Sequence, residues 1–404
     1  MNHSRDETLD AESEPHAATH VELPNPVRAL QTFGQSVWLD DLHRGLFTSG
    51  EFRRLIDEDG LRGVTSNPSI FEKAFAGSTD YLHALHEIER SGDVEPMALY
   101  EALAIGDIRD AADLLHAVYA STERADGYVS LEVSPYLAHD TDATINEARR
   151  LWQAVARDNV MIKVPASTEG LPAIRELTSE GINVNITLLF GIERYEAVAR
   201  AYTEGLSSFV RNGGDPARVS SVASFFVSRI DTMVDDTIAT RLATVTDAGV
   251  HSSLTELLGA VAIANAKLAY QRYLTLVRTP EWQALADMGA RPQRLLWAST
   301  STKNPQYRDV RYVEELIGRD TVSTITPATL EAFRDHGRLR ASLEDNLEGT
   351  RSTIGALERV GISLDDVTDR LLEDGITRFR TAFDNLLAAV DQGRRSRIAP
   401  IGRR

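Results

Sequence analysis

Eight short stretches rich in β-branched and apolar residues recur along the chain, and segments with helical periodicity separate them. Strands that alternate with helices pair in parallel through right-handed crossovers. Eight such units suit a closed barrel better than an open sheet, so the spacing predicts an α/β fold of the (β/α)8 TIM-barrel type. The predicted strands are 36–40, 62–67, 128–133, 159–164, 182–187, 220–224, 294–299 and 321–325.

A doubly wound open sheet could use the same alternation of strands and helices. Its nucleotide site normally carries a glycine fingerprint directly after the first strand. Here that turn reads "LDDLHRG", and the notable glycine pair, in "RNGGDP" at 211–216, precedes a strand instead of following one. We interpret that pair as a turn from a helix into a strand. The barrel is therefore the favoured fold.

The chain lacks internal repeats and long Pro/Gly linkers, which favours a single domain over residues 26–395. Two connections, at about 68–127 and 225–293, are long enough to hold more than one helix each and are predicted to be helical insertions. From Pro327 onward the pattern is helical, which predicts a helical C-terminal segment. Two tails complete the prediction: a disordered acidic tail at 1–25 and a basic tail at 396–404.

Composition excludes several kinds of function. The 404 residues include no cysteine, so thiol nucleophiles and disulfides are impossible, which fits a cytoplasmic protein. A formal net charge of −17 disfavours nucleic acid and anionic membranes as partners, and no run approaches the roughly 20 apolar residues of a membrane helix. His83 and His86 lack a third ligand at useful spacing, so we expect no metal site. The oligomeric state stays open.

One of only four lysines, Lys163, lies inside the apolar stretch "NVMIKV" at 159–164. Side chains alternate along a strand, so Val160, Ile162 and Val164 face the helices while Lys163 faces the barrel interior. That interior opens at the carboxyl ends of the strands, where barrel active sites lie. The same alternation directs further polar residues inward near that end: Asp40, Asn67, Glu132, Asn185 and Thr187.

Each of these residues alone has a structural interpretation, such as a hydrogen-bonded interior amide or a buried ion pair. Together they are costly to bury, and a core built only for stability would use Val or Leu instead. A desolvated lysine is partly neutral and can attack a carbonyl to form a Schiff base, while nearby carboxylates move the protons. This chemistry requires no cofactor.

Motifs along the chain strengthen this interpretation. They are "WLDDLHRG", "GVTSNPSIF", "SLEVSP", "IKVPAS", "GINVNITLLF", "SFFVSRID" and "LLWAST", and they span roughly residues 30 to 335. In this order they resemble the transaldolase family, in its longer form with extra helices, within the class I aldolase superfamily. The resemblance implies a metal-independent enzyme of the pentose phosphate pathway. Such an enzyme transfers a dihydroxyacetone unit from sedoheptulose 7-phosphate to glyceraldehyde 3-phosphate, giving erythrose 4-phosphate and fructose 6-phosphate.

The resemblance also implies the catalytic roles. Lys163 matches the Schiff-base lysine, and Asp40 matches the acid/base that takes the proton from the donor's C4 hydroxyl. Glu132 and Thr187 match the pair that holds a water which relays protons during imine formation. Asp41 is an alternative to Asp40, and strand alternation favours Asp40 because it shares a face with Trp38.

Further matches imply how a phosphorylated ketose or aldose is bound. The seventh strand departs from the short-chain pattern "ASFR": here the text is "ASTSTKN", so the cation is displaced to Lys303. Lys303 can also be interpreted as a solvated loop lysine, but in a lysine-poor chain the phosphate role is favoured. The predicted substrate-binding residues are Asn67, Asn185, Ser224, Phe226, Arg229, Ser299 and Lys303.

Two other functions remain possible at this stage. A fructose 6-phosphate aldolase shares the lysine chemistry but releases free dihydroxyacetone. Glu132 and Phe226 argue against it, because that branch tends to carry Gln and Tyr at the matching positions. A non-catalytic sugar-phosphate binder that kept the barrel is disfavoured because the set of Asp40, Glu132 and Lys163 is complete.

Overall fold

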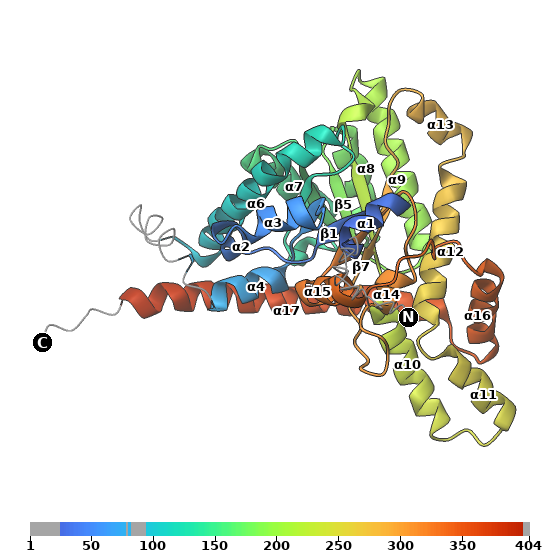
Figure 1. Cartoon of the computed structure of the whole chain (residues 1–404). Coiled ribbons are helices and arrows are strands. Elements are labelled where there is room, and N and C mark those ends of the chain that lie inside the picture. Colours follow the sequence, from blue (N-terminus) through green and yellow to red (C-terminus); the bar gives the residue numbers. More distant parts are fainter. Residues whose placement is uncertain (1–24, 78–79, 82–93, 399–404) are drawn as a thin grey trace, which may run out of the picture.

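The computed structural model describes residues 25–77, 80–81 and 94–398, and its eight strands form a closed parallel barrel (Figure 1). Strand order around the barrel follows the chain, and β8 closes it by pairing with β1. The predicted (β/α)8 fold is therefore confirmed. The strands are β1 Gln35–Leu39, β2 Gly63–Thr65, β3 Tyr128–Glu132, β4 Val160–Pro165, β5 Val184–Leu189, β6 Ser221–Phe226, β7 Arg294–Ala298 and β8 Thr321–Ile325.

The strands hold together because their outward faces are apolar and fully covered. Val160, Ile162 and Val164 of β4 have no exposed surface, as expected for parallel strands covered by helices. The barrel seam continues beyond β1, where the backbone N–H of Asp40 donates to the carbonyl of Ile325 over 2.9 Å. Asp40 thereby occupies a fixed position at the end of the first strand.

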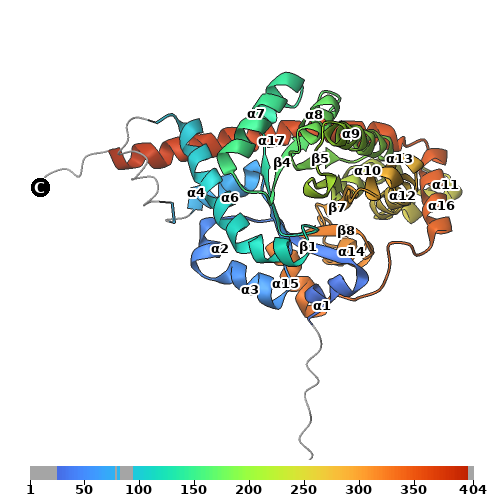
Figure 2. The same cartoon turned by 90° about the horizontal axis from the view of Figure 1, so that it is seen from above.

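Helices surround the barrel, and Figure 2 shows α7, α8, α9 and α12 outside the strands. Most of them follow a strand directly, as the alternation in the sequence requires. The described residues also contain three single-turn 3-10 helices, η1 Leu30–Phe33, η2 Pro135–Leu137 and η3 Pro216–Arg218. The barrel helices are α1 Pro26–Ala29, α2 Arg44–Thr48, α3 Glu51–Glu58, α7 Thr141–Val155, α8 Gly170–Ser179, α9 Ile192–Arg211, α14 Arg311–Glu314 and α15 Pro327–His336.

The two long connections contain the expected extra helices. The first holds α4 (Pro68–Gly77) and the 26-residue α6 (Pro96–Ser121), which packs along β3. The second holds α10 (Ser228–Leu242), α11 (Ala248–Leu257), α12 (Val261–Leu276) and α13 (Pro280–Ala286). Its central helix, α12, packs against α9 and α10 and against α16 (Leu347–Arg359) from the C-terminal segment.

The chain ends in a 35-residue helix, α17 (Leu364–Ile398), which lies across the carboxyl end of the barrel. It packs against α4, α6, α10 and β5, and in Figure 1 it runs in red beneath α4. The predicted helical C-terminal segment is therefore confirmed. The helix continues three residues into the predicted basic tail at 396–404, while 1–24 and 399–404 lie outside the described residues. No helix in the described ranges is long and apolar enough to cross a membrane.

Candidate active site

A cavity of about 220 Å³ opens at the carboxyl end of the barrel. Eight of the eleven site residues predicted from the sequence line it. The other three lie on barrel strands: Glu132 is next to Lys163, Asn185 is hydrogen-bonded to Ser224, and Thr187 is on β5. This agreement follows from strand alternation, because interior side chains near the strand ends must meet at one mouth. The eight lining residues are Asp40, Asn67, Lys163, Ser224, Phe226, Arg229, Ser299 and Lys303.

Lys163 lies on β4 with only 5% of its surface exposed. Its Nζ is 3.6 Å from Glu132 Oε2, because Lys163 and Glu132 are paired across the neighbouring strands β3 and β4. Nζ also donates a hydrogen bond of 3.2 Å to the carbonyl of Ser66 and lies 5.9 Å from the ring centroid of Phe379 on α17. The amine is thus enclosed by protein and still lines the cavity.

Glu132 is the carboxylate next to this amine, and its side chain is 7% exposed. Burial raises the pKa of Glu132 to about 7, although the charge of Lys163 opposes that rise and Asp40 adds to it. Oε2 has no hydrogen-bond partner within the described part of the protein. A carboxyl group with this pKa can accept or release a proton close to neutral pH.

Asp40 and Asp41 are adjacent but face different surroundings. Asp40 lines the cavity, and its Oδ1 accepts a hydrogen bond of 3.0 Å from Thr65 Oγ1 on β2. Asp41 instead lies 3.8 Å from His43, and burial is the main cause that raises its pKa. The geometry therefore agrees with the choice of Asp40 that strand alternation favoured.

A chain of hydrogen bonds runs through the barrel interior beneath the cavity. Ser224 on β6 donates to Asn185 Oδ1 over 2.7 Å, and Asn185 Nδ2 donates to Ser130 Oγ over 2.9 Å. These bonds fix the amide of Asn185, which is fully buried. Thr187 is also fully buried, and its hydroxyl has no hydrogen-bond partner in the described residues.

Asn67 and Ser299 line the cavity from positions just beyond the end of a strand. Asn67 follows β2 and begins α4: its Oδ1 accepts from the backbone N–H of Ile70 over 3.1 Å. Ser299 follows β7 with a φ of 56°, in the left-handed region that non-glycine residues seldom adopt. Strained positions of this kind cluster at functional sites. The predicted strand 62–67 was too long, because β2 begins at Gly63 and ends at Thr65, and Asn67 lies beyond it.

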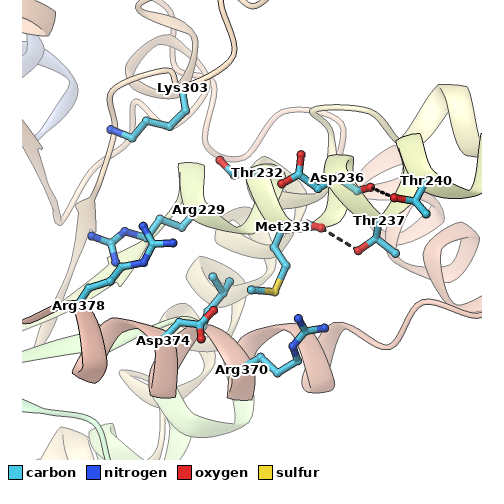
Figure 3. A pocket seen from close by; sticks show the side chains of 11 residues that line it. Arg229, Thr232, Met233, Asp236, Thr237, Thr240, Lys303, Arg370, Asp374 and Arg378 are labelled. Carbon is cyan, nitrogen blue, oxygen red and sulfur yellow. Dashed lines mark hydrogen bonds between the residues drawn. The ribbon is translucent and has the colours of Figure 1, made fainter.

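Cationic side chains gather at one side of the cavity. Arg229 on α10 and Lys303 after β7 line both this cavity and a neighbouring one of about 510 Å³ between α10 and α17. Figure 3 shows the guanidinium groups of Arg229 and Arg378 next to each other. Burial lowers the pKa of Arg229, and the charge of Arg378 lowers it further. This cluster is suited to an anion.

Sequence reasoning did not assign several residues around the cavity to the site, including Lys73, Arg378 and Phe379. Lys73 on α4 and Phe379 on α17 line the cavity, and Arg378 on α17 stands beside Arg229. All three belong to helices that reach the mouth only through tertiary packing, so no local motif marks them.

Lys267 is a second buried lysine, and it lies away from the cavity. Its Nζ donates to the carbonyl of Asp345 over 3.2 Å and lies 3.9 Å from Glu315 Oε2. No group of three or more His, Asp or Glu suited to a metal occurs in the ranges that the structure describes. His83 and His86 lie outside those ranges.

Fold and site together define an enzyme of the (β/α)8-barrel class with a buried lysine at the carboxyl ends of its strands. Residues 37–390 match the family model described as transaldolase/fructose-6-phosphate aldolase, and the chain belongs to this family.

Curated relatives can be aligned with this chain over nearly its whole length. A protein named transaldolase from Trichodesmium erythraeum is 45% identical over 372 residues, covering 92% of this chain and 98% of the relative. One of the same name from Thiobacillus denitrificans is 47% identical, covering 91% and 99%. A third, from Frankia alni, is 42% identical, covering 92% and 98%.

Proposed function

We propose that this chain is a transaldolase that moves a dihydroxyacetone unit from sedoheptulose 7-phosphate to glyceraldehyde 3-phosphate through an imine at Lys163. The observation that carries the proposal is the buried amine of Lys163, 3.6 Å from Glu132, in a cavity that Asp40 also lines. The family and the names of the relatives support the same reaction.

Imine formation begins when the neutral amine of Lys163 attacks the ketose C2 carbonyl, giving a carbinolamine. Protonation of the carbinolamine hydroxyl releases water and leaves an iminium ion. Glu132, whose pKa is raised to about 7 by burial, can supply that proton and take it back near neutral pH. The unpartnered oxygens of Glu132 and Thr187 support a water held between them that relays the proton.

Cleavage then needs a base on the far side of the substrate. Asp40 takes the proton from the C4 hydroxyl, the C3–C4 bond breaks, and its electron pair moves into the iminium, which becomes an enamine. The shorter aldose phosphate leaves. The enamine attacks the aldehyde carbon of the acceptor, Asp40 returns the proton, and water hydrolyses the new imine to free Lys163.

Polar groups around the cavity support binding of the donor in this proposal. Asn67, Asn185 and Ser224 can bond its hydroxyls. The phosphate is assigned to the cations at the mouth, where charge-assisted hydrogen bonds offset the repulsion from a net charge of −17. We include Arg378 beside Arg229, Ser299 and Lys303 in this phosphate site because of its position in Figure 3.

Fructose 6-phosphate aldolase activity is the rival, and an acceptor-dependence assay distinguishes the two. We expect turnover of fructose 6-phosphate only when erythrose 4-phosphate is present. Release of free dihydroxyacetone without an acceptor would assign the aldolase reaction instead, and no turnover in either assay would indicate a sugar-phosphate binder.

We also infer that the protein is cytoplasmic, since the chain contains no cysteine. We infer that residues 26–395 form one domain, since the chain contains no long linker.

A further inference from the structure

The segment 299–310 connects β7 to α14 and brings Lys303 to the mouth of the cavity; we refer to it as the Lys303 loop. Its first residue is tied to the start of α10. The backbone N–H of Ser228 donates to the carbonyl of Ser299 over 3.1 Å, and the hydroxyls of the same two residues are also 3.1 Å apart.

A second residue hydrogen-bonded to α10 is Tyr307, near the end of the Lys303 loop. The hydroxyl of Tyr307 donates to Asp235 Oδ2 over 2.7 Å, while Asp235 Oδ1 accepts from the backbone N–H of Gly259 over 2.9 Å. Gly259 has a φ of +66°, and a Cβ there would lie 2.6 Å from Tyr307 Cζ. Glycine at 259 therefore lets the tyrosine ring approach the backbone of the connection between α11 and α12 closely.

A third residue hydrogen-bonded to α10 is Tyr312 on α14, the helix that follows the Lys303 loop. The hydroxyl of Tyr312 donates to Asp231 Oδ2 over 2.9 Å, and Asp231 Oδ1 accepts from the backbone N–H of Ala262 over 2.7 Å. Asp231 is 1% exposed, and burial raises its pKa to about 6. Asp231 and Asp235 are one helical turn apart, so both tyrosines meet the same face of α10.

These ties matter because α10 also carries Arg229. Lys303 and Arg229 line the same cavity, and their like charges repel each other. The pKa of Lys303 is lowered first by desolvation and then by Arg229. An untied loop would relieve that repulsion by moving Lys303 into solvent.

We propose that Tyr307 and Asp235 are positioning residues that hold the Lys303 loop against α10, so that Lys303 and Arg229 meet one phosphate group. The inference rests on the proposed phosphate role of Lys303. It also accounts for the displaced cation of this chain: Lys303 lies four residues beyond Ser299, so the longer reach needs an anchor further along the loop.

Tyr307→Phe tests the proposal, since it removes one hydroxyl and keeps the ring beside Gly259. We expect KM for fructose 6-phosphate to rise at least roughly fivefold, which corresponds to the loss of about 1 kcal/mol from one hydrogen bond. With unphosphorylated fructose as donor, kcat/KM should stay within about twofold of the parent. Asp235→Ala, a second variant, should show the same selectivity. The matched control is Tyr270→Phe, whose hydroxyl donates to the Arg319 carbonyl over 3.1 Å, and it should change neither donor.

Combining Tyr307→Phe with Lys303→Ala separates positioning from general support of the fold. If Tyr307 acts through Lys303, the double variant should have the KM of Lys303→Ala alone. Additive losses, equal losses on both donors, or an unchanged Tyr307→Phe beside an impaired Lys303→Ala would each overturn the inference. If Lys303→Ala itself leaves KM unchanged, the phosphate role of Lys303 fails, and the inference falls with it, while acceptor-dependent turnover still tests the proposed function separately.

Discussion

Two lysines of this chain are equally buried, at 5% exposure each, but they lie in different regions. Lys163 is on a barrel strand and lines the cavity at the mouth. Lys267 is on α12 in the second helical insertion, and it ties that helix to the segment that contains Asp345. Each amine donates to one backbone carbonyl over 3.2 Å and lies within 4 Å of one glutamate.

The carboxylates beside the two amines explain why burial alone does not make a catalytic lysine. Glu132 is 7% exposed and its pKa is raised to about 7, whereas Glu315 is 33% exposed and also pairs with Arg340. Lys163 has a second acid, Asp40, across an open cavity. A buried amine becomes useful when space for a substrate and groups that move protons accompany it.

The largest expected effect is the difference in turnover between a variant of Lys163 and the same variant of Lys267. Lys163→Arg should reduce turnover to less than roughly one thousandth of the parent, because a guanidinium is not a nucleophile at neutral pH. Lys267→Arg should keep turnover within about threefold, since that site only needs a cation. Steady-state kinetics on fructose 6-phosphate and erythrose 4-phosphate measure both, and equal losses would show that the two regions do not differ in function.

Asp40, the second acid near Lys163, gives the next largest expected effect. Asp40→Ala should lower turnover by about 10²–10⁴-fold, the usual contribution of one general acid/base, and slow cleavage more than imine formation. Asp41→Ala is the matched control because its side chain faces His43 instead of the cavity. Single-turnover kinetics separate the two steps. A loss in Asp41→Ala as large as that in Asp40→Ala would mean that the wrong aspartate was assigned.

The cations near Lys163 give a smaller, more selective effect. Arg340 near Lys267 is held by Glu315 and Asp345, whereas no carboxylate in the described ranges forms an ion pair with Arg229. Arg229→Ala should raise KM for fructose 6-phosphate at least roughly tenfold, since a charge-assisted hydrogen bond contributes about 1.5–3 kcal/mol. Lys303→Ala should do so more mildly. With fructose as donor both variants should resemble the parent, and equal losses on both donors would place the phosphate site elsewhere.

The last effect concerns the free energy of unfolding and its pH dependence, and it leaves substrate binding aside. The pKa of Glu132 is raised in the folded protein from 4.5 to about 7, so its stabilising contribution is fully present below pH 4.5 and is lost as the pH rises through about 7. Glu132→Gln removes this loss, so between pH 5 and pH 8 it should gain on the order of 3 kcal/mol relative to the parent. Chemical denaturation at both pH values measures it. Glu315→Gln is the exposed control, and the same gain in that variant would contradict the assignment.

Much of the fold and site follows from the sequence because strands have a period of two. The alternation of Val160, Ile162 and Val164 fixes where Lys163 points, and closing the barrel brings the other strand ends to the same mouth. The chain order of the strands is also their order in space, so residues on consecutive strands, such as Glu132 on β3 and Lys163 on β4, become neighbours in the site.

What the sequence did not reveal comes from helices that reach the site by tertiary packing. Arg378 and Phe379 belong to α17, and its periodicity indicates a buried helix without showing what it covers. The contact of Lys267 with the Asp345 carbonyl spans 78 positions of the chain, and the bond between Tyr307 and Asp235 spans 72. No local pattern encodes such contacts.

Reductive trapping tests the central claim most directly. Fructose 6-phosphate and borohydride should convert the imine into a stable secondary amine, and peptide mapping by mass spectrometry should locate one reduced dihydroxyacetone unit at Lys163. Lys267 should stay unmodified although it is equally buried. A label at Lys267, at Lys73 or at no lysine would contradict the account.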